Sequence, residues 1–310
     1  MNVMLQVDKL SKKFNDFQAV KNLSFTVNQG DVYGFLGQNG AGKSTTLRML
    51  LKLIKPTSGE IIFSGKNIKD DGDDMLKQTG AIIERPDVYK YLSAYDNLSI
   101  FAKMSGIKAT RKLIMDQLEM VGLADRFDSK AKTYSQGMKQ RLGIAIALVH
   151  SPKLIILDEP TNGLDPQGIA DMRNLILRLS REMGKTVIVS SHLLSEIELI
   201  ANRMIIIHKG VKVVEGDVAT LLDPADTVVE INTTDNGAAF LQLQQTEWKE
   251  RTTKTAKNLR VRTNKNDVPQ IINTLSAVGI NLLAVQPRHS LEDYFLSLTN
   301  NDTHVEPFTN

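Results

Sequence analysis

The sequence predicts an α/β protein with a central parallel sheet, followed by a smaller α/β domain. Three observations support this: a glycine-rich loop between a strand and a helix, an apolar strand that ends in two acids, and a later alternation of strand and helix patterns. The loop, residues 37–45, reads Gly-Gln-Asn-Gly-Ala-Gly-Lys-Ser-Thr and lies between strand-like residues 32–36 and helix-like residues 46–51. This order of strand, glycine loop and helix is that of a P-loop.

The loop residues are suited to hold a polyphosphate. Gly37, Gly40 and Gly42 have no Cβ, so backbone N–H groups can surround phosphate oxygens at the positive end of the following helix. We expect Lys43 to reach the β- and γ-phosphates and Ser44 to offer its hydroxyl to Mg²⁺. A glycine-rich turn with a surface lysine is the alternative, but the spacing favours the P-loop. The expected nucleotide-binding residues are Gly37, Asn39, Gly40, Ala41, Gly42, Lys43, Ser44 and Thr45.

The composition is that of an ordinary globular protein. At 310 residues, 42% hydrophobic and 24% charged, the chain is long enough for two domains. Its longest apolar stretches are far shorter than the roughly 18 residues of a membrane helix. The net charge of +3, without a concentrated Lys/Arg stripe, argues against a nucleic-acid partner. The sequence has no cysteine, which excludes disulfides, and no signal-peptide pattern, so cytoplasmic residence is expected.

Patterns along the chain predict several parts of a first domain. Residues 4–27 read as two strands around an Asn-Asp turn signal, which predicts an antiparallel β subdomain. Residues from about 86 to 150 carry apolar side chains at helical spacing and predict an inserted helical subdomain. From residue 154 to 207, strands alternate with helices, as in a parallel sheet with right-handed crossovers. Together these parts form an expected domain at residues 1–220.

The pattern restarts in a second domain, expected at residues 224–299. The predicted order is strand 227–231, helix 238–245, a polar Lys/Thr-rich link, strand 258–262, helix 268–278, strand 280–285 and a closing helix 291–298. We expect residues 300–310 to form a disordered tail. No nucleotide-binding pattern occurs in this part of the sequence.

Two acids follow the most apolar strand of the first domain. Residues 154–157 read Leu-Ile-Ile-Leu, as expected for a buried parallel strand, and Asp158 and Glu159 come next. Ligands of open α/β sheets bind at the carboxyl ends of the strands, so both acids should lie near the phosphate loop. Asp158 suits Mg²⁺ coordination, and Glu159 suits the base that orients the attacking water.

At this point the chain resembles the nucleotide-binding subunits of ATP-binding-cassette (ABC) transporters. Residues 134–141, Tyr-Ser-Gln-Gly-Met-Lys-Gln-Arg, match the signature sequence of that family. Ser135 and Gly137 of this segment stand before an expected helix at residues 140–149, where they suit the stabilisation of γ-phosphate charge. The neighbouring Tyr, Gln and Met depart from the commonest form of the signature. The resemblance covers residues 3 to 220 and is weak from residue 224 onward.

Further positions match other motifs of the family. Residues 162–165, Asn-Gly-Leu-Asp, match its D-loop. His192 matches the switch histidine, which implies a role in holding the γ-phosphate and the attacking water. Phe14 matches the aromatic residue that stacks on adenine, with a core phenylalanine as the alternative.

Glu84 departs from the family pattern in an informative way. It stands where most members carry glutamine, and glutamate there resembles exporters of the bacitracin and lantibiotic type. The resemblance implies that Glu84 binds Mg²⁺ and relays nucleotide occupancy to a membrane subunit. A solvated loop acid is the alternative.

The resemblance implies an ATPase with a P-loop core of ABC type, using ATP and Mg²⁺. It implies a homodimer, or a pseudo-symmetric heterodimer, in which each chain's signature completes the partner's site. Membrane subunits on separate chains would hold this dimer at the cytoplasmic face of the cell membrane. The resemblance points to the export of peptide antibiotics. Export of a lipid, a polysaccharide, sodium or a drug is an alternative function, and so is a non-transport ABC ATPase.

Overall fold

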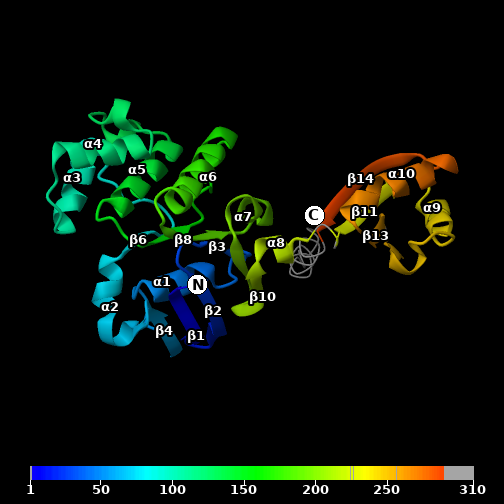
Figure 1. Cartoon of the computed structure of the whole chain (residues 1–310), viewed down its shortest axis with the longest axis horizontal. Helices are drawn as coiled ribbons and strands as arrows, with labels where there is room; N and C mark the ends of the chain where they lie inside the picture. Colours follow the sequence, from blue (N-terminus) through cyan, green and yellow to red (C-terminus); the bar gives the residue numbers. More distant parts are fainter. Residues whose placement is uncertain (1, 224, 226, 256, 290–310) are drawn as a thin grey trace, which may run out of the picture. The chain divides into compact units, whose positions relative to one another are not determined.

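The structure, a computed structural model, describes residues 2–223, 225, 227–255 and 257–289 (Figure 1). The chain divides into two compact units, Met1–Asp217 and Val218–Asn310. The predicted class is confirmed, because the first unit combines an antiparallel sheet with a mainly parallel sheet and helices. Within the described ranges, no helix is long and apolar enough to cross a membrane.

An antiparallel sheet of order β2-β1-β4-β5 opens the first unit. Its strands are β1 (Val3–Phe14), β2 (Phe17–Asn28), β4 (Ser58–Phe63) and β5 (Lys66–Asn67). The predicted Asn-Asp turn joins β1 to β2, and Phe14 pairs with Phe17 beside it. Apolar side chains of β1, β2 and β4 enter one core with side chains of the larger sheet.

The larger sheet carries the carboxyl-terminal strand ends expected at the site. Its order is β10-β9-β3-β8-β7-β6. The strands are β3 (Val32–Gly37), β6 (Thr79–Ile82), β7 (Leu154–Asp158), β8 (Thr186–Ser191), β9 (Arg203–His208) and β10 (Val211–Asp217). All neighbours pair in parallel except β10 with β9. Strands β3, β7 and β8 are buried throughout, as parallel strands covered on both faces should be.

The helices of the first unit fall into two groups. Those beside the two sheets are α1 (Lys43–Leu50), α2 (Ile68–Lys77), α6 (Pro166–Arg181) and α7 (Leu194–Ile200). Those of the helical part are α3 (Ala94–Met104), α4 (Arg111–Met120) and α5 (Gln136–Leu148), with short 3₁₀ turns η1 (Ala124–Arg126) and η2 (Ala131–Thr133). Helices α3, α4 and α5 gather away from the β1-β2 hairpin (Figure 1).

Helix α5 begins earlier than the sequence pattern predicted. The expected start at residue 140 is wrong, because the helix begins at Gln136 with Ser135 as its N-cap. The Ser135 hydroxyl accepts a hydrogen bond from the Met138 amide, which stabilises the first turn. The apolar periodicity starts only after this turn, so it missed the polar residues that open the helix.

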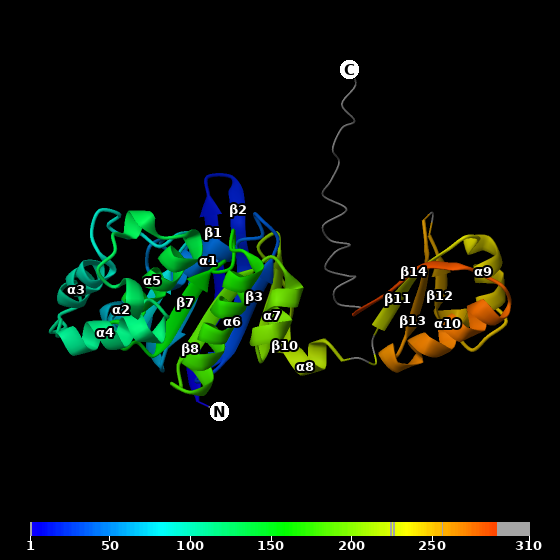
Figure 2. The ribbon, with the colours of Figure 1, turned by 90° about the horizontal axis from the view of Figure 1, so that it is seen from above.

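The second unit is a four-stranded antiparallel sheet with helices (Figure 2). Its order is β12-β13-β11-β14, with strands β11 (Thr227–Thr233), β12 (Thr252–Lys254), β13 (Leu259–Thr263) and β14 (Leu282–His289). The helices are α8 (Val218–Leu221), α9 (Asn236–Leu243) and α10 (Val268–Ala277), with 3₁₀ turns η3 (Lys249–Arg251) and η4 (Lys265–Asp267). Side chains of β11, β13, α9 and α10 share one core around the buried Trp248.

One prediction for this unit is wrong: the polar link contains strand β12. This strand pairs with β13 at the edge of the sheet, where the side chains of Thr253 and Lys254 are exposed. An edge strand needs backbone hydrogen bonds and not apolar alternation, which is why the pattern did not reveal it. The predicted helix at 291–298 and the tail at 300–310 lie outside the described residues.

Candidate functional site

The phosphate loop connects β3 to α1 in a conformation that only small residues allow. A Cβ on Gly37 would lie 2.8 Å from the carbonyl oxygen of Ile207, and one on Gly42 would lie 2.7 Å from that of Ala19. Gly40 and Gly42 have φ angles of 81° and 102°, in the left-handed region that favours glycine. No side chain caps the first turn of α1. Its first N–H groups are therefore suited to an anion.

Lys43 points into this loop. The residue is 5% exposed, and its ammonium donates to the carbonyl oxygens of Gly37 at 2.7 Å and Gln38 at 3.2 Å. It also lies 3.1 Å from Glu159 Oε1. The buried ammonium thus stands between the loop and the acid that follows β7, where it can neutralise phosphate charge.

The two predicted acids are linked to the neighbouring strand by Ser190, the residue before Ser191 at the end of β8. Asp158 is 2% exposed, and its Oδ1 accepts a hydrogen bond from the Ser190 hydroxyl. The same hydroxyl oxygen accepts from the backbone N–H of Glu159 at 2.9 Å. Ser190 therefore fixes the end of β7 against β8, with both carboxylates at the same edge of the sheet.

Glu159 connects the lysine to the histidine. Its Oε2 lies 3.2 Å from Nδ1 of His192, while Oε1 faces Lys43. The residue has a φ of 48°, a left-handed conformation that costs a non-glycine residue about 1–3 kcal/mol and persists only when neighbouring contacts hold it. The structure thus brings Lys43, Asp158, Glu159 and His192 together as the sequence predicted, with one strained residue at their centre.

The signature residues lie in a separate place, beside the D-loop of the same chain. Gln136 Nε2 donates to the carbonyl oxygen of Asn162 at 3.0 Å. Ser135 and Gly137 line a cavity of about 170 Å³ together with Leu164 and Asp165. They do not join the cluster around Lys43 through any hydrogen bond or ion pair between the described residues.

Glu84 and Phe14 make contacts that the sequence did not predict. The carboxylate of Glu84 forms an ion pair with Arg48 of α1, and its backbone has a φ of 65°. Phe14 is 42% exposed at the tip of the hairpin, with the Lys12 ammonium 4.8 Å from its ring centre. An exposed aromatic face with a cation beside it suits a planar, electron-rich ligand, whereas a core phenylalanine would be buried.

The oxygen ligands at the site fit Mg²⁺. Ser44, the second residue of α1, supplies a hydroxyl, and the end of β7 supplies the Asp158 carboxylate. Among the residues that the structure describes, no three His, Cys, Asp or Glu side chains cluster in a way that holds a metal. Mg²⁺ typically takes one or two protein oxygens and completes its shell with phosphate oxygens and water, so this donor set suits it.

Three residues near the site escaped the sequence reasoning. Ser190 was visible as a polar residue in an apolar strand, two residues before the predicted histidine. Arg48 and Glu196 gave no signal, because each reads as an ordinary charged residue of a helix. Glu196 accepts hydrogen bonds from Thr161, in the loop after Glu159, and from Ser191, at the end of β8.

Comparisons with known proteins agree with this geometry. Residues 20–162 match the family described as ABC transporter. Over 305 residues the chain is 41% identical to the bacitracin transport ATP-binding protein BcrA of Bacillus licheniformis, covering 98% of this chain and 99% of the relative. Over 212 residues it is 43% identical to the lantibiotic transport ATP-binding protein SrtF of Streptococcus pyogenes, covering 68% of this chain and 90% of the relative.

A solved structure shows the same core. The dimeric ATP-binding cassette MJ0796, bound to ADP and Pi, matches with a TM-score of 0.63 and 27% identity, covering 69% of this chain and 99% of that one. The similarity to the bacitracin protein extends through the second unit as well as the first. Since the likeness runs through almost the whole chain and not the phosphate loop alone, the chain belongs to the ABC transporter family, as an ATP-binding subunit that hydrolyses ATP to drive transport.

Proposed function

We propose that the chain powers the export of peptide antibiotics of the bacitracin or lantibiotic class through membrane subunits on separate chains. The observation that carries this proposal is Glu84 in the position of the usual glutamine, together with near full-length similarity to a bacitracin transport protein. Its carboxylate contacts Arg48, which belongs to the same helix as Lys43 and Ser44. A change at the phosphates can therefore reach the loop of Glu84 through α1.

In the proposed site, the loop and the first turn of α1 hold the phosphates of ATP, and Phe14 stacks on the adenine. Lys43 neutralises charge on the β- and γ-phosphates. Glu159 accepts the proton of the attacking water, and His192 holds the γ-phosphate and that water in line. Ser44 and Asp158, with Glu84 as a third proposed ligand, would hold Mg²⁺, which would supply positive charge at the phosphate oxygens.

We infer that two such subunits work together at the cytoplasmic face of the membrane, as a homodimer or a pseudo-symmetric heterodimer. The placement of Ser135 and Gly137 away from Lys43 supports this, because each signature can then serve the nucleotide of the partner. An isologous pair completes both sites at once. The membrane partner would receive the motion of the helical part and of Glu84.

The proposal is tested by comparing Glu84→Ala with Asp87→Ala, a matched change of an exposed acid in the same loop. Cells that express the chain with its membrane subunits are challenged with bacitracin and with a lantibiotic, and the ATPase activity of each purified variant is measured. We expect Glu84→Ala to lose resistance while the isolated subunit keeps most of its ATPase activity, because Ser44, Asp158 and Glu159 remain. Glu84→Gln should lose less, since it keeps an oxygen at the same reach.

Three outcomes would contradict the proposal. Parent-level resistance in Glu84→Ala cells would remove the coupling role of this residue. Unchanged susceptibility to both antibiotics on deletion of the whole chain would point to another exported substrate, such as a lipid or a drug. Co-purification with a nucleic acid or ribosome in place of a membrane protein would favour the non-transport alternative.

A further inference from the structure

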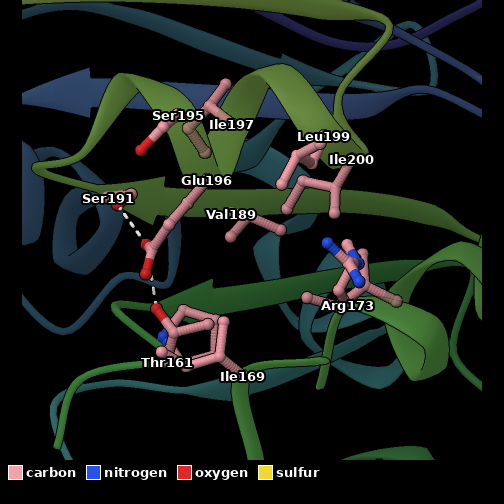
Figure 3. A pocket seen from close by; sticks show the side chains of 12 residues that line it. Thr161, Ile169, Arg173, Val189, Ser191, Ser195, Glu196, Ile197, Leu199 and Ile200 are labelled. Carbon is pink, nitrogen blue, oxygen red and sulfur yellow. Dashed lines mark hydrogen bonds between the residues drawn. The ribbon is translucent and has the colours of Figure 1, made fainter. Parts of the chain in front are cut away.

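We propose that Glu196 is a positioning residue that clamps the loop of Glu159 to the loop of His192 and so sets the alignment of both catalytic groups. Figure 3 shows its side chain reaching from α7 toward Ser191 and Thr161. One carboxylate oxygen, Oε2, accepts a hydrogen bond from the Ser191 hydroxyl at 2.7 Å and another from the Thr161 hydroxyl at 2.9 Å. The inference rests on the proposed roles of Glu159 and His192.

The two donors belong to the two segments that must be aligned. Thr161 lies two residues after Glu159, with only Pro160 between them, and Ser191 directly precedes His192. The Ser191 hydroxyl oxygen also accepts from the backbone N–H of Leu193 at 3.0 Å, so it fixes the turn around the histidine. A single carboxylate therefore ties together the backbone on either side of the contact between Glu159 and His192.

The strain at Glu159 makes such a clamp necessary. Its left-handed φ of 48°, directly before a proline, is unfavourable for glutamate and requires support from both sides. On the amino-terminal side, the Ser190 hydroxyl accepts a hydrogen bond from the backbone N–H of Glu159. Glu196, through Thr161, supports the chain after it. Hydrogen bonds to an ionised acceptor are roughly twice as strong as neutral ones, which suits a carboxylate to this task.

The surroundings of Glu196 suggest a variant that removes the hydrogen bonds without leaving a gap. Its side chain borders an apolar cavity of about 130 Å³, also lined by Ile169, Val189 and Leu199 (Figure 3). Methionine has a similar length and is tolerated against apolar surfaces, so Glu196→Met removes the acceptor while it keeps the packing. Glu196→Gln keeps an acceptor oxygen. Glu198→Met makes the same change at an exposed position of α7 and serves as the control.

The first measurement separates turnover from binding. We expect Glu196→Met to lower kcat for ATP by about 10- to 100-fold, because small misplacements of catalytic groups cost that much. The Kd for a fluorescent ATP analogue should change by less than about twofold, since the hydrogen bonds of Glu196 go to Thr161 and Ser191 and not to the phosphate loop. Glu196→Gln should recover most of kcat, and Glu198→Met should match the parent. A rise in Kd equal to the fall in kcat, or parent-level kcat, would overturn the proposal.

The second measurement tests whether Glu196 acts through the histidine. In a His192→Ala background, adding Glu196→Met should lower single-turnover hydrolysis by a smaller factor than in the parent background, because only Glu159 is left to align. An equal fall in both backgrounds would show a merely structural role. If His192→Ala and Glu159→Gln hydrolyse ATP at the parent rate, the proposed site itself is wrong. If only Glu196→Met does so, the clamp alone is wrong.

Discussion

At the scale of single residues, Glu159 is central to the site, because its carboxylate contacts both Lys43 and His192 while its backbone is strained. Glu159→Gln keeps a side chain of the same size but cannot take up a proton. We expect kcat to fall by roughly 100-fold or more while ATP binding is retained. Steady-state ATPase assays and ATP-analogue binding measure the two effects, and size exclusion in ATP should show a trapped dimer. Hydrolysis at the parent rate by a monomer would show that another group is the base.

At the scale of elements, the close approach of α7 to β3 depends on Gly34. A Cβ there would lie 2.2 Å from Cγ2 of Ile197, the buried residue that seats α7 on the sheet. We expect Gly34→Ala to lower the free energy of unfolding by about 1–3 kcal/mol, because the helix must shift outward. Urea unfolding measures this change.

The control for this change is Gly106→Ala. Gly106 has a φ of 74°, and a Cβ added there would have no other atom within 4 Å. Alanine at this position should therefore lower the free energy of unfolding only through backbone strain, by about 1–2 kcal/mol. ATPase activity is a second measurement that separates the two variants. It should fall in Gly34→Ala, where α7 is displaced, and stay at the parent level in Gly106→Ala. Full activity of Gly34→Ala would contradict the link between α7 and the site.

Helix α9 provides a pH-dependent element in the second unit. The Asp235 carboxylate caps this helix by accepting from the amides of Ala238 at 2.9 Å and Gly237 at 2.8 Å. These two hydrogen bonds, with a smaller effect of Lys254, hold the pKa of Asp235 below its ordinary value. A lowered folded-state pKa contributes stability above the unfolded-state pKa, and this contribution is lost as the pH falls through the folded-state pKa.

We therefore expect acid to destabilise the second unit partly through this cap. Asp235→Asn keeps a capping oxygen that does not titrate, so its loss of stability between pH 5 and strong acid should be smaller than that of the parent. Trp248 is the only tryptophan of the chain and is 3% exposed in the core of this unit. Its fluorescence during urea unfolding reports the effect, and identical pH profiles would exclude the cap as the cause.

Sequence patterns predicted most elements but not all of their ends or neighbours. Residues 37–45, the acids after β7 and His192 lie in short motifs whose spacing carries the information, and the structure brings them into contact; their catalytic roles stay predictions. Strand β12 was missed because edge pairing leaves no apolar pattern. The clamp by Glu196 was also invisible, because an acceptor on a helix becomes recognisable only when the fold brings two hydroxyls to it.

At the scale of the whole molecule, the two compact units make a separation experiment possible. The second unit has a core of its own around Trp248, and the predicted site residues all belong to the first unit. We expect a chain that ends at Asp217 to fold and bind ATP with an unchanged Kd, measured with a fluorescent analogue. The role of residues 224–299 in regulation or dimer stability stays a prediction. A folded fragment without ATP affinity would show that the second unit helps to form the site.

Strand β8 lies between β3 and β7 in the sheet, although it follows both of them along the chain. During synthesis, the phosphate loop and the two acids therefore leave the ribosome long before β8 and β9, the strands that pair with β3. Until those strands emerge, β3 and β7 present unpaired edges to solvent, which favours chaperone binding or aggregation. The ability to bind nucleotide should arise late and abruptly in translation, and nascent chains stalled before Thr186 should lack it however complete their motifs are.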